Sequence, residues 1–135
     1  ERATIEAAIA REGVGDRAFL LGDRGDIPQL LPAFTLFAMS SISEGYSIAL
    51  LEACASALPI VATRVGGNAE IVADGVNGLV VPSRDPAALA GAFEDVLSDA
   101  ARADAMGRAG RDWLLSNATF EVMLARYLDV YANRA

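Results

Sequence analysis

Two acidic side chains, Glu44 and Glu52, stand eight positions apart in a stretch that carries no other charge. Ser47 is a good N-cap, and the residues from Ile48 to Ala57 are apolar apart from Glu52 and Ser56. A helix that is apolar on nearly every side is expected to be buried. Positions four apart share a helix face, so both carboxylates should line one edge of this helix, where an uncompensated charge is costly. A polar group of the protein or of a ligand is expected to contact the two carboxylates there, and both residues are therefore candidates for a functional site.

The residues alone leave three interpretations of this pair open. Glu52 could be a buried carboxylate satisfied by backbone N–H groups, with Glu44 a surface acid of the loop. The pair could instead be the acid and nucleophile of a glycosidase, although nothing else in the sequence supports this. In a binding site, the helix N-terminus after Ser47 would suit an anionic phosphate, and the carboxylates would accept from vicinal hydroxyls.

Short apolar runs alternate with helical segments along the chain. A helix over residues 2–12 precedes a buried strand at Ala18–Leu21, and Asp26 can cap a short helix from Ile27 to Ala33. Further strands are expected at Thr35–Met39, Ile60–Thr63 and Leu79–Val81. This alternation predicts an α/β fold with a Rossmann-like parallel sheet covered by helices on both faces. Such a sheet binds ligands beyond the carboxyl ends of its strands, and the loop after Met39 carries Glu44.

Gly66 and Gly67 follow the strand Ile60–Thr63 and lead into a short helix that holds Glu70 in its first turn. They could allow a ligand phosphate or sugar to approach the backbone, or they could simply form a tight turn from strand to helix. Both interpretations stay open.

The chain is helical after Asp85, an N-cap followed by Pro86. We expect three helices whose apolar residues pack on the sheet as core rather than as a cofactor site. The inward residues would be Leu89, Phe93, Val96 and Leu97 in the first helix, Met106, Ala109, Trp113 and Leu114 in the second (101–115), and Phe120, Met123, Leu124, Tyr127, Leu128 and Tyr131 in the third.

Composition excludes several classes of protein. The chain has 135 residues, enough for one domain, and its 53% hydrophobic and 21% charged residues describe a soluble globular protein. The net charge of −7, with scattered basic residues, argues against binding nucleic acid. The absence of histidine removes the usual general base and the commonest metal ligand, and the single cysteine, Cys54, is expected in the core. No apolar run reaches the roughly 20 residues that span a bilayer.

The stretch Glu44-Gly45-Tyr46-Ser47-Ile48-Ala49-Leu50-Leu51-Glu52-Ala53 resembles the E-x7-E signature of retaining glycosyltransferases of family 4, the glycosyl transferases group 1, which have the two-domain GT-B fold. The resemblance continues through Pro59–Thr63, Gly66-Gly67, Glu70–Val72 and Gly75–Pro82. One departure is Ala57, which stands where the family usually has glycine.

This resemblance implies a role for each site residue. Glu44 would be catalytic and accept from hydroxyls of the transferred sugar, and Glu52 would accept from the ribose hydroxyls. The backbone of Gly45, Tyr46, Ser47 and Ile48 would line the sugar and phosphates. Gly22, Arg24 and Ile27 would mark a loop near the nucleobase. Transfer would retain anomeric configuration, with no metal in the site and no cofactor besides the nucleotide-sugar donor.

The same resemblance implies that residues 1–135 are an N-terminally incomplete donor-binding domain. Its partners would be a glycosyl acceptor, such as a glycan or lipid in polysaccharide biosynthesis, and the N-terminal domain of the same protein. That domain could associate peripherally with the inner face of a membrane, which implies a cytoplasmic enzyme. The alternatives are a Rossmann-like nucleotide-binding or regulatory module without transferase activity, and a sugar-nucleotide epimerase.

In a doubly wound sheet of order 3-2-1-4-5-6, Ala18–Leu21 would be strand 3 and Thr35–Met39 strand 4. The two strands between them would lie upstream of Glu1. We therefore expect the isolated chain to close this gap, by pairing the two segments directly or by borrowing a partner's strand, and to lack transferase activity.

Overall fold

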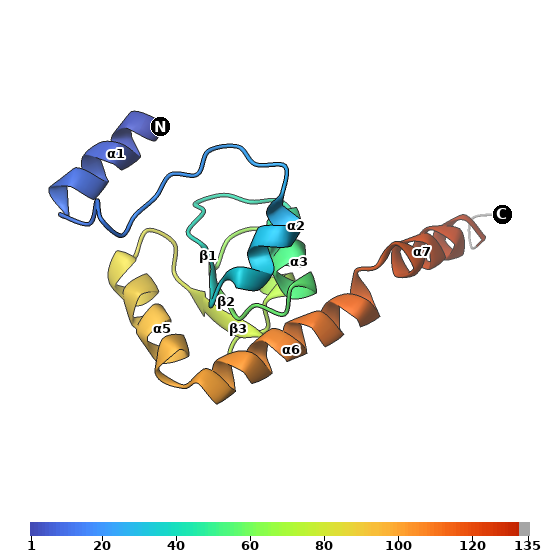
Figure 1. Ribbon diagram of the computed structural model, residues 1–135. Helices are drawn as coiled ribbons and strands as arrows, with labels where there is room; N and C mark the ends of the chain where they lie inside the picture. The colour runs from blue at the N-terminus through green and yellow to red at the C-terminus, as the bar shows by residue number, and fades with distance from the viewer. Residues whose placement is uncertain (133–135) are drawn as a thin grey trace.

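A computed structural model describes residues 1–132 and places a three-stranded parallel sheet at their centre (Figure 1). The strands are β1 (Phe37–Met39), β2 (Ile60–Thr63) and β3 (Gly78–Val81), in the order β1-β2-β3. Ala62 of β2 lies opposite Met39 on one side and Val80 on the other. The predicted α/β fold with a parallel sheet flanked by helices is confirmed, and β2 lies where the sequence predicts it.

The helices account for most of the remaining ordered structure. They are α1 (Arg2–Arg11), α2 (Ile27–Leu30), the 3₁₀ turn η1 (Leu31–Ala33), α3 (Ile48–Ala55), α4 (Asn68–Ile71), α5 (Pro86–Ser98), α6 (Ala100–Asn117) and α7 (Phe120–Ala132). Asp85 caps α5 as predicted, since its carboxylate accepts from the amide of Ala88 at 2.9 Å.

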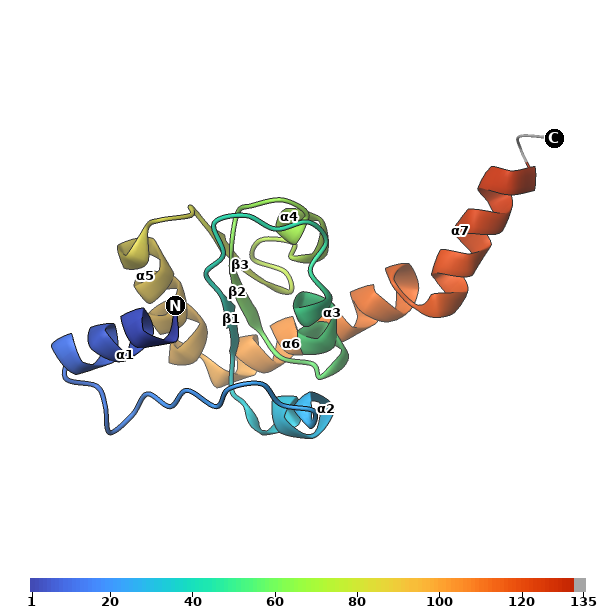
Figure 2. The same ribbon diagram turned by 90° about the horizontal axis from the view of Figure 1, so that it is seen from above.

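Each face of the sheet carries its own hydrophobic core, and Figure 2 shows α3 and α5 on opposite sides of the strands. All four residues of β2 are buried because this strand is central and covered on both faces. One core packs residues of α3 and α4 against Ile60 and Ala62, and the other packs residues of α5 and α6 against Val61 and Val81. Cys54 belongs to the first core, as predicted, and burial raises the pKa of its thiol to about 11.

Helix α6 crosses the end of α3 at very short range. A Cβ atom added to Gly107 would lie 1.9 Å from the carbonyl oxygen of Ala57, so only glycine fits this crossing. Ala57 itself has φ +55°, a left-handed conformation that favours glycine. The backbone thus explains the glycine that the resemblance leads us to expect at this position.

The predicted strand at Ala18–Leu21 is wrong. These residues are irregular, and Phe19 is 73% exposed. Of the two expected ways to close the gap, direct pairing of this segment with strand Thr35–Met39 does not occur, because β1 pairs with β2 alone among the described residues. An apolar run forms a strand only when a neighbouring strand satisfies its backbone groups, and here none does.

The predicted burial of the last helix is also wrong. Figure 2 shows α7 leading away from the sheet, beyond the end of α6. Its expected core residues are all exposed: Phe120, Met123, Leu124, Tyr127, Leu128 and Tyr131. Leu97 of α5 is likewise exposed rather than inward. Helix α7 does have an apolar face, but the direction of its axis leaves that face without a neighbouring layer among residues 1–132.

Candidate functional site

The loop between β1 and α3 lies at the carboxyl edge of the sheet, at the same end as the loop that leads from β2 to α4 (Figure 2). Ser47 ends the loop and caps α3, accepting a long hydrogen bond (3.4 Å) from the amide of Leu50. Its side chain is buried, which fixes the start of the helix. The predicted cap is confirmed, and it places Gly45, Tyr46 and Ser47 directly before the free N–H groups of α3.

Glu44 is half-buried in this loop, and its carboxylate has a defined partner. The hydroxyl of Ser41 donates to Glu44 Oε1 at 2.6 Å. The hydroxyl of Thr63, at the end of β2, in turn donates to the carbonyl oxygen of Ser41 at 2.6 Å. The loop that carries Glu44 is therefore tied by side chains to the end of the neighbouring strand.

Gly66 and Gly67 lie in close contact with the backbone of the loop between β1 and α3. The amide of Gly67 donates to the carbonyl oxygen of Gly45 at 2.8 Å. Gly66 has φ +48°, and a Cβ atom there would lie 1.8 Å from the carbonyl oxygen of Glu44. The turn into α4 is present as predicted, but what requires the glycines is the contact between two loops of the protein.

Glu52 does not lie on a buried helix edge, so that prediction is wrong. Helix α3 buries Leu50, Ala53 and Cys54 against the sheet, whereas Glu52 is exposed and Ile48 is 71% exposed. The apolar pattern was misleading because Ile48 and Ala55 lie on the exposed side of α3, which no layer formed by residues 1–132 covers. The Glu52 carboxylate is therefore open to solvent, with no hydrogen bond or ion pair among residues 1–132.

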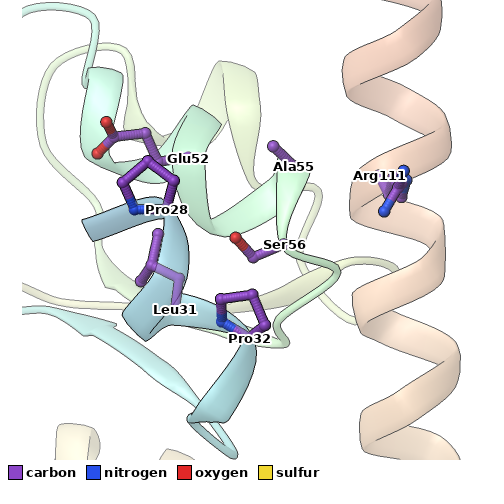
Figure 3. A pocket seen from close by; sticks show the side chains of 7 residues that line it. All are labelled: Pro28, Leu31, Pro32, Glu52, Ala55, Ser56 and Arg111. Carbon is purple, nitrogen blue, oxygen red and sulfur yellow. The ribbon is translucent and has the colours of Figure 1, made fainter. Parts of the chain in front are cut away.

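A cavity of about 410 Å³ opens beside Glu52 (Figure 3). Pro28, Leu31 and Pro32 come from α2 and η1, and Glu52, Ala55 and Ser56 come from α3 and its end. Arg111 approaches from α6 on the far side. The cavity thus has an apolar wall and a hydroxyl group, with Glu52 and Arg111 at its border and the Glu52 carboxylate pointing away from Arg111 (Figure 3).

The segment proposed to meet a nucleobase, marked by Gly22, Arg24 and Ile27, runs into α2 and so toward this cavity. Arg24 donates to both carboxylate oxygens of Asp26, at 2.7 and 2.5 Å, and this hydrogen bonding lowers the pKa of Asp26. Asp26 therefore holds Arg24 and does not cap α2 with its side chain, contrary to prediction. Ile27 packs against the core, and Gly22 is exposed with φ +71°.

Several functional candidates escaped the sequence analysis. Ser41 and Thr63 lie at the ends of adjacent strands, and hydroxyl residues at such ends are the only sequence signal that could have marked them. Arg111 lines the cavity beside Glu52 from α6, which is distant in sequence, and no local pattern marks it. In the described part of the chain, no group of acidic residues and cysteine is arranged to hold a metal ion. None of its helices is both long and apolar enough to cross a membrane.

Most of the sequence matches a protein family. The family described as "Glycosyl transferases group 1" covers residues 1–113, which include both glutamates and both loops of the site. The chain belongs to the glycosyl transferases group 1 family.

Named relatives agree with this membership. The chain is 44% identical over 91 residues to GDP-mannose-dependent alpha-(1-6)-phosphatidylinositol monomannoside mannosyltransferase of Mycolicibacterium smegmatis, covering 67% of this chain and 24% of that protein. It is 35% identical over 138 residues to alpha-maltose-1-phosphate synthase of Mycobacterium tuberculosis, covering 96% of this chain and 35% of that protein.

The fold of this glycosyltransferase-family chain is also found among solved structures. The Anabaena protein Alr3699/HepE, in complex with UDP, superposes with a TM-score of 0.92 at 25% identity, over 97% of this chain and 36% of that one. The chain thus spans about a quarter to just over a third of the length of these three relatives.

Proposed function

We propose that this chain is the donor-binding part of a glycosyltransferase that takes its sugar from a nucleotide-sugar. The observation that carries the proposal is the placement of the two glutamates. Glu44 is anchored at the carboxyl edge of the sheet, just before the N-terminus of α3, and Glu52 is exposed farther along the same helix, at the border of an open cavity. The names of the relatives support a nucleotide-sugar donor, since one is GDP-mannose-dependent and HepE is also known in complex with UDP-glucose.

Each part of such a donor has a group suited to it. The diphosphate would lie at the N-terminus of α3, where free N–H groups and the positive end of the helix dipole favour an anion. Glu52 would accept from the ribose hydroxyls, and Glu44 from hydroxyls of the sugar. The backbone of Gly45, Tyr46, Ser47 and Ile48 would line the sugar and phosphates between them.

We place the nucleobase next to the segment marked by Gly22, Arg24 and Ile27, where the chain turns into α2. Glu44 would act in catalysis by holding the transferred sugar for attack by the acceptor, with retention of anomeric configuration. Neither a metal ion nor a further cofactor is part of this proposal.

The rest of the enzyme belongs to the proposal as well. The acceptor, a glycan or lipid, and an N-terminal domain of the same protein would complete the site from the side that faces the carboxyl edge of the sheet. Peripheral attachment to the inner face of a membrane, and hence a cytoplasmic location, would come through that domain. We further propose that residues 1–135 alone transfer no sugar.

Calorimetric titration of the full-length enzyme with UDP and GDP tests the nucleotide part. Glu52→Gln should weaken binding of the preferred nucleotide roughly ten- to a hundredfold, because a charged hydrogen bond is worth about 1.5–3 kcal/mol. Glu94→Gln, on the exposed side of α5, is the matched control and should leave the affinity unchanged. Equal affinity of the Glu52 variant and the wild type would remove the ribose assignment.

The sugar part is tested by Glu44→Ala in the same enzyme. Turnover should fall while affinity for the bare nucleotide is kept, because only the sugar is expected to reach Glu44. A nucleotide-binding module would bind the nucleotide yet transfer no sugar to any acceptor, and an epimerase would interconvert nucleotide-sugars without an acceptor. Either result would replace the transferase proposal.

A further inference from the structure

A chain of three hydrogen bonds leads from the first residue of α4 to the carboxylate of Glu44. It begins with Asn68, which is fully buried and donates from Nδ2 to the carbonyl oxygen of Thr63 at 3.0 Å. Asn68 Oδ1 has no hydrogen-bond partner among the described residues, although an unsatisfied buried acceptor is costly. The Asn68 side chain therefore links the first residue of α4 to the end of β2.

The second bond passes from β2 to the loop that follows β1. Thr63 is 3% exposed, and its hydroxyl donates to the carbonyl oxygen of Ser41 at 2.6 Å. This oxygen belongs to the irregular backbone just after β1, where no strand pairing could hold it. The buried hydroxyl of Thr63 therefore sets the position of the Ser41 backbone.

The third bond reaches the functional carboxylate. The hydroxyl of Ser41 donates its single proton to Glu44 Oε1 at 2.6 Å, a distance typical of a strong bond to a charged acceptor. Glu44 Oε2 has no partner among residues 1–132. One oxygen is thus anchored, and the other is left for a ligand.

We propose that Ser41 is a positioning residue of this enzyme, which turns the Glu44 carboxylate so that Oε2 meets a hydroxyl of the donor sugar. This inference rests on the proposed function, because it assumes that Glu44 binds the sugar. A carboxylate on a loop can rotate freely. Fixing one of its oxygens should therefore strengthen binding of the donor sugar and improve the alignment of the transferred group. Ser41 itself does not touch the donor.

The test compares Ser41→Ala with the wild-type full-length enzyme, using UDP, UDP-glucose, GDP and GDP-mannose in calorimetric titrations. The nucleotide-sugar should bind about tenfold more weakly to the variant, and kcat should fall by about the same factor. Affinity for the matching nucleoside diphosphate should not change. A general loss of loop structure would instead weaken binding of the nucleoside diphosphate as well. Ser41→Thr keeps the hydroxyl and should restore both values.

Ser43→Ala is the matched control. Ser43 lies two residues farther along the same loop and is exposed, and its hydroxyl makes no hydrogen bond within the part of the chain that the structure describes. The substitution is chemically the same, so it should leave nucleotide-sugar affinity and kcat at wild-type values. A loss equal to that of Ser41→Ala would assign the effect to the loop in general and overturn the inference.

A double-mutant cycle with Glu44→Gln decides whether Ser41 acts through Glu44. Ser41→Ala should have little further effect once the carboxylate is gone, and the same tenfold loss in that background would refute the inference. If Glu44→Gln loses sugar affinity while Ser41→Ala does not, the inference fails but the proposed function stands. If the wild type gains no affinity from the sugar, and Glu44→Gln changes nothing, the proposed function fails and the inference with it.

Discussion

The amide of Gly67 donates to the carbonyl oxygen of Gly45 at 2.8 Å, which joins the loops that follow two neighbouring strands. Gly66 makes the junction tight, because its Cα faces the carbonyl oxygen of Glu44 with no room for a side chain. The backbone that presents Glu44 is therefore supported from β2 as well as from its own strand. The position of this loop depends on an element that is distant from it in sequence.

Gly66→Ala should destabilise the protein by about 2–4 kcal/mol, since it combines a left-handed φ with a clash against backbone. Gly91→Ala is the matched control, because a Cβ atom at Gly91 meets nothing within 4 Å and the residue lies inside α5. That control should stabilise the protein by about 0.5–1 kcal/mol. Urea denaturation followed by circular dichroism measures both, and a Gly66 variant as stable as the wild type would contradict the loop contact.

Thr63→Val should destabilise the protein by about 1–2 kcal/mol, because the part-buried carbonyl oxygen of Ser41 loses its donor while the side-chain volume is kept. Thr4→Val on the exposed side of α1 is the control, with an expected change within about 0.5 kcal/mol. The free energy of unfolding of each variant is the quantity to compare. Equal effects at the two positions would mean that the Thr63 bond contributes nothing.

Ala57→Gly should stabilise the protein by about 1 kcal/mol, because Ala57 has φ +55° at the end of α3. The same substitution in a helix, Ala90→Gly in α5, should instead cost about 1 kcal/mol. Thermal denaturation of the two variants should therefore shift the midpoint in opposite directions. A decrease for both would show that the left-handed conformation carries no strain.

Stability should fall at alkaline pH because of Cys54. Its folded pKa of about 11 lies above the ordinary value of 9.0, since burial disfavours the thiolate. The neutral thiol contributes fully below pH 9.0, and its contribution is lost as the pH rises from 9.0 through about 11. Cys54→Ala removes this titration, so its unfolding free energy should decline less over that range than the wild type's. If the unfolding free energies of the variant and the wild type decline in parallel, the thiol is in contact with water in the folded protein.

Local patterns were enough to predict much of the framework. Strand β2 and the core of β3 follow from short apolar runs, and the starts of α3 and α5 follow from the caps Ser47 and Asp85. Each of these signals acts between residues close in sequence, so the sequence carries it complete. The E-x7-E stretch likewise led to the family, because an ordered run of residue types can be recognised without coordinates.

Tertiary structure decided whatever depends on a distant neighbour. Ala18–Leu21 is apolar enough for a strand but has no strand to pair with, and the apolar face of α7 has no layer to cover it among residues 1–132. Glu52 is exposed because the elements around α3 leave one of its sides open. The bonds from Thr63 to Ser41 and from Ser41 to Glu44 exist only because parallel pairing brings the ends of β1 and β2 together. Burial and pairing are properties of two surfaces at once, and a sequence pattern describes only one of them.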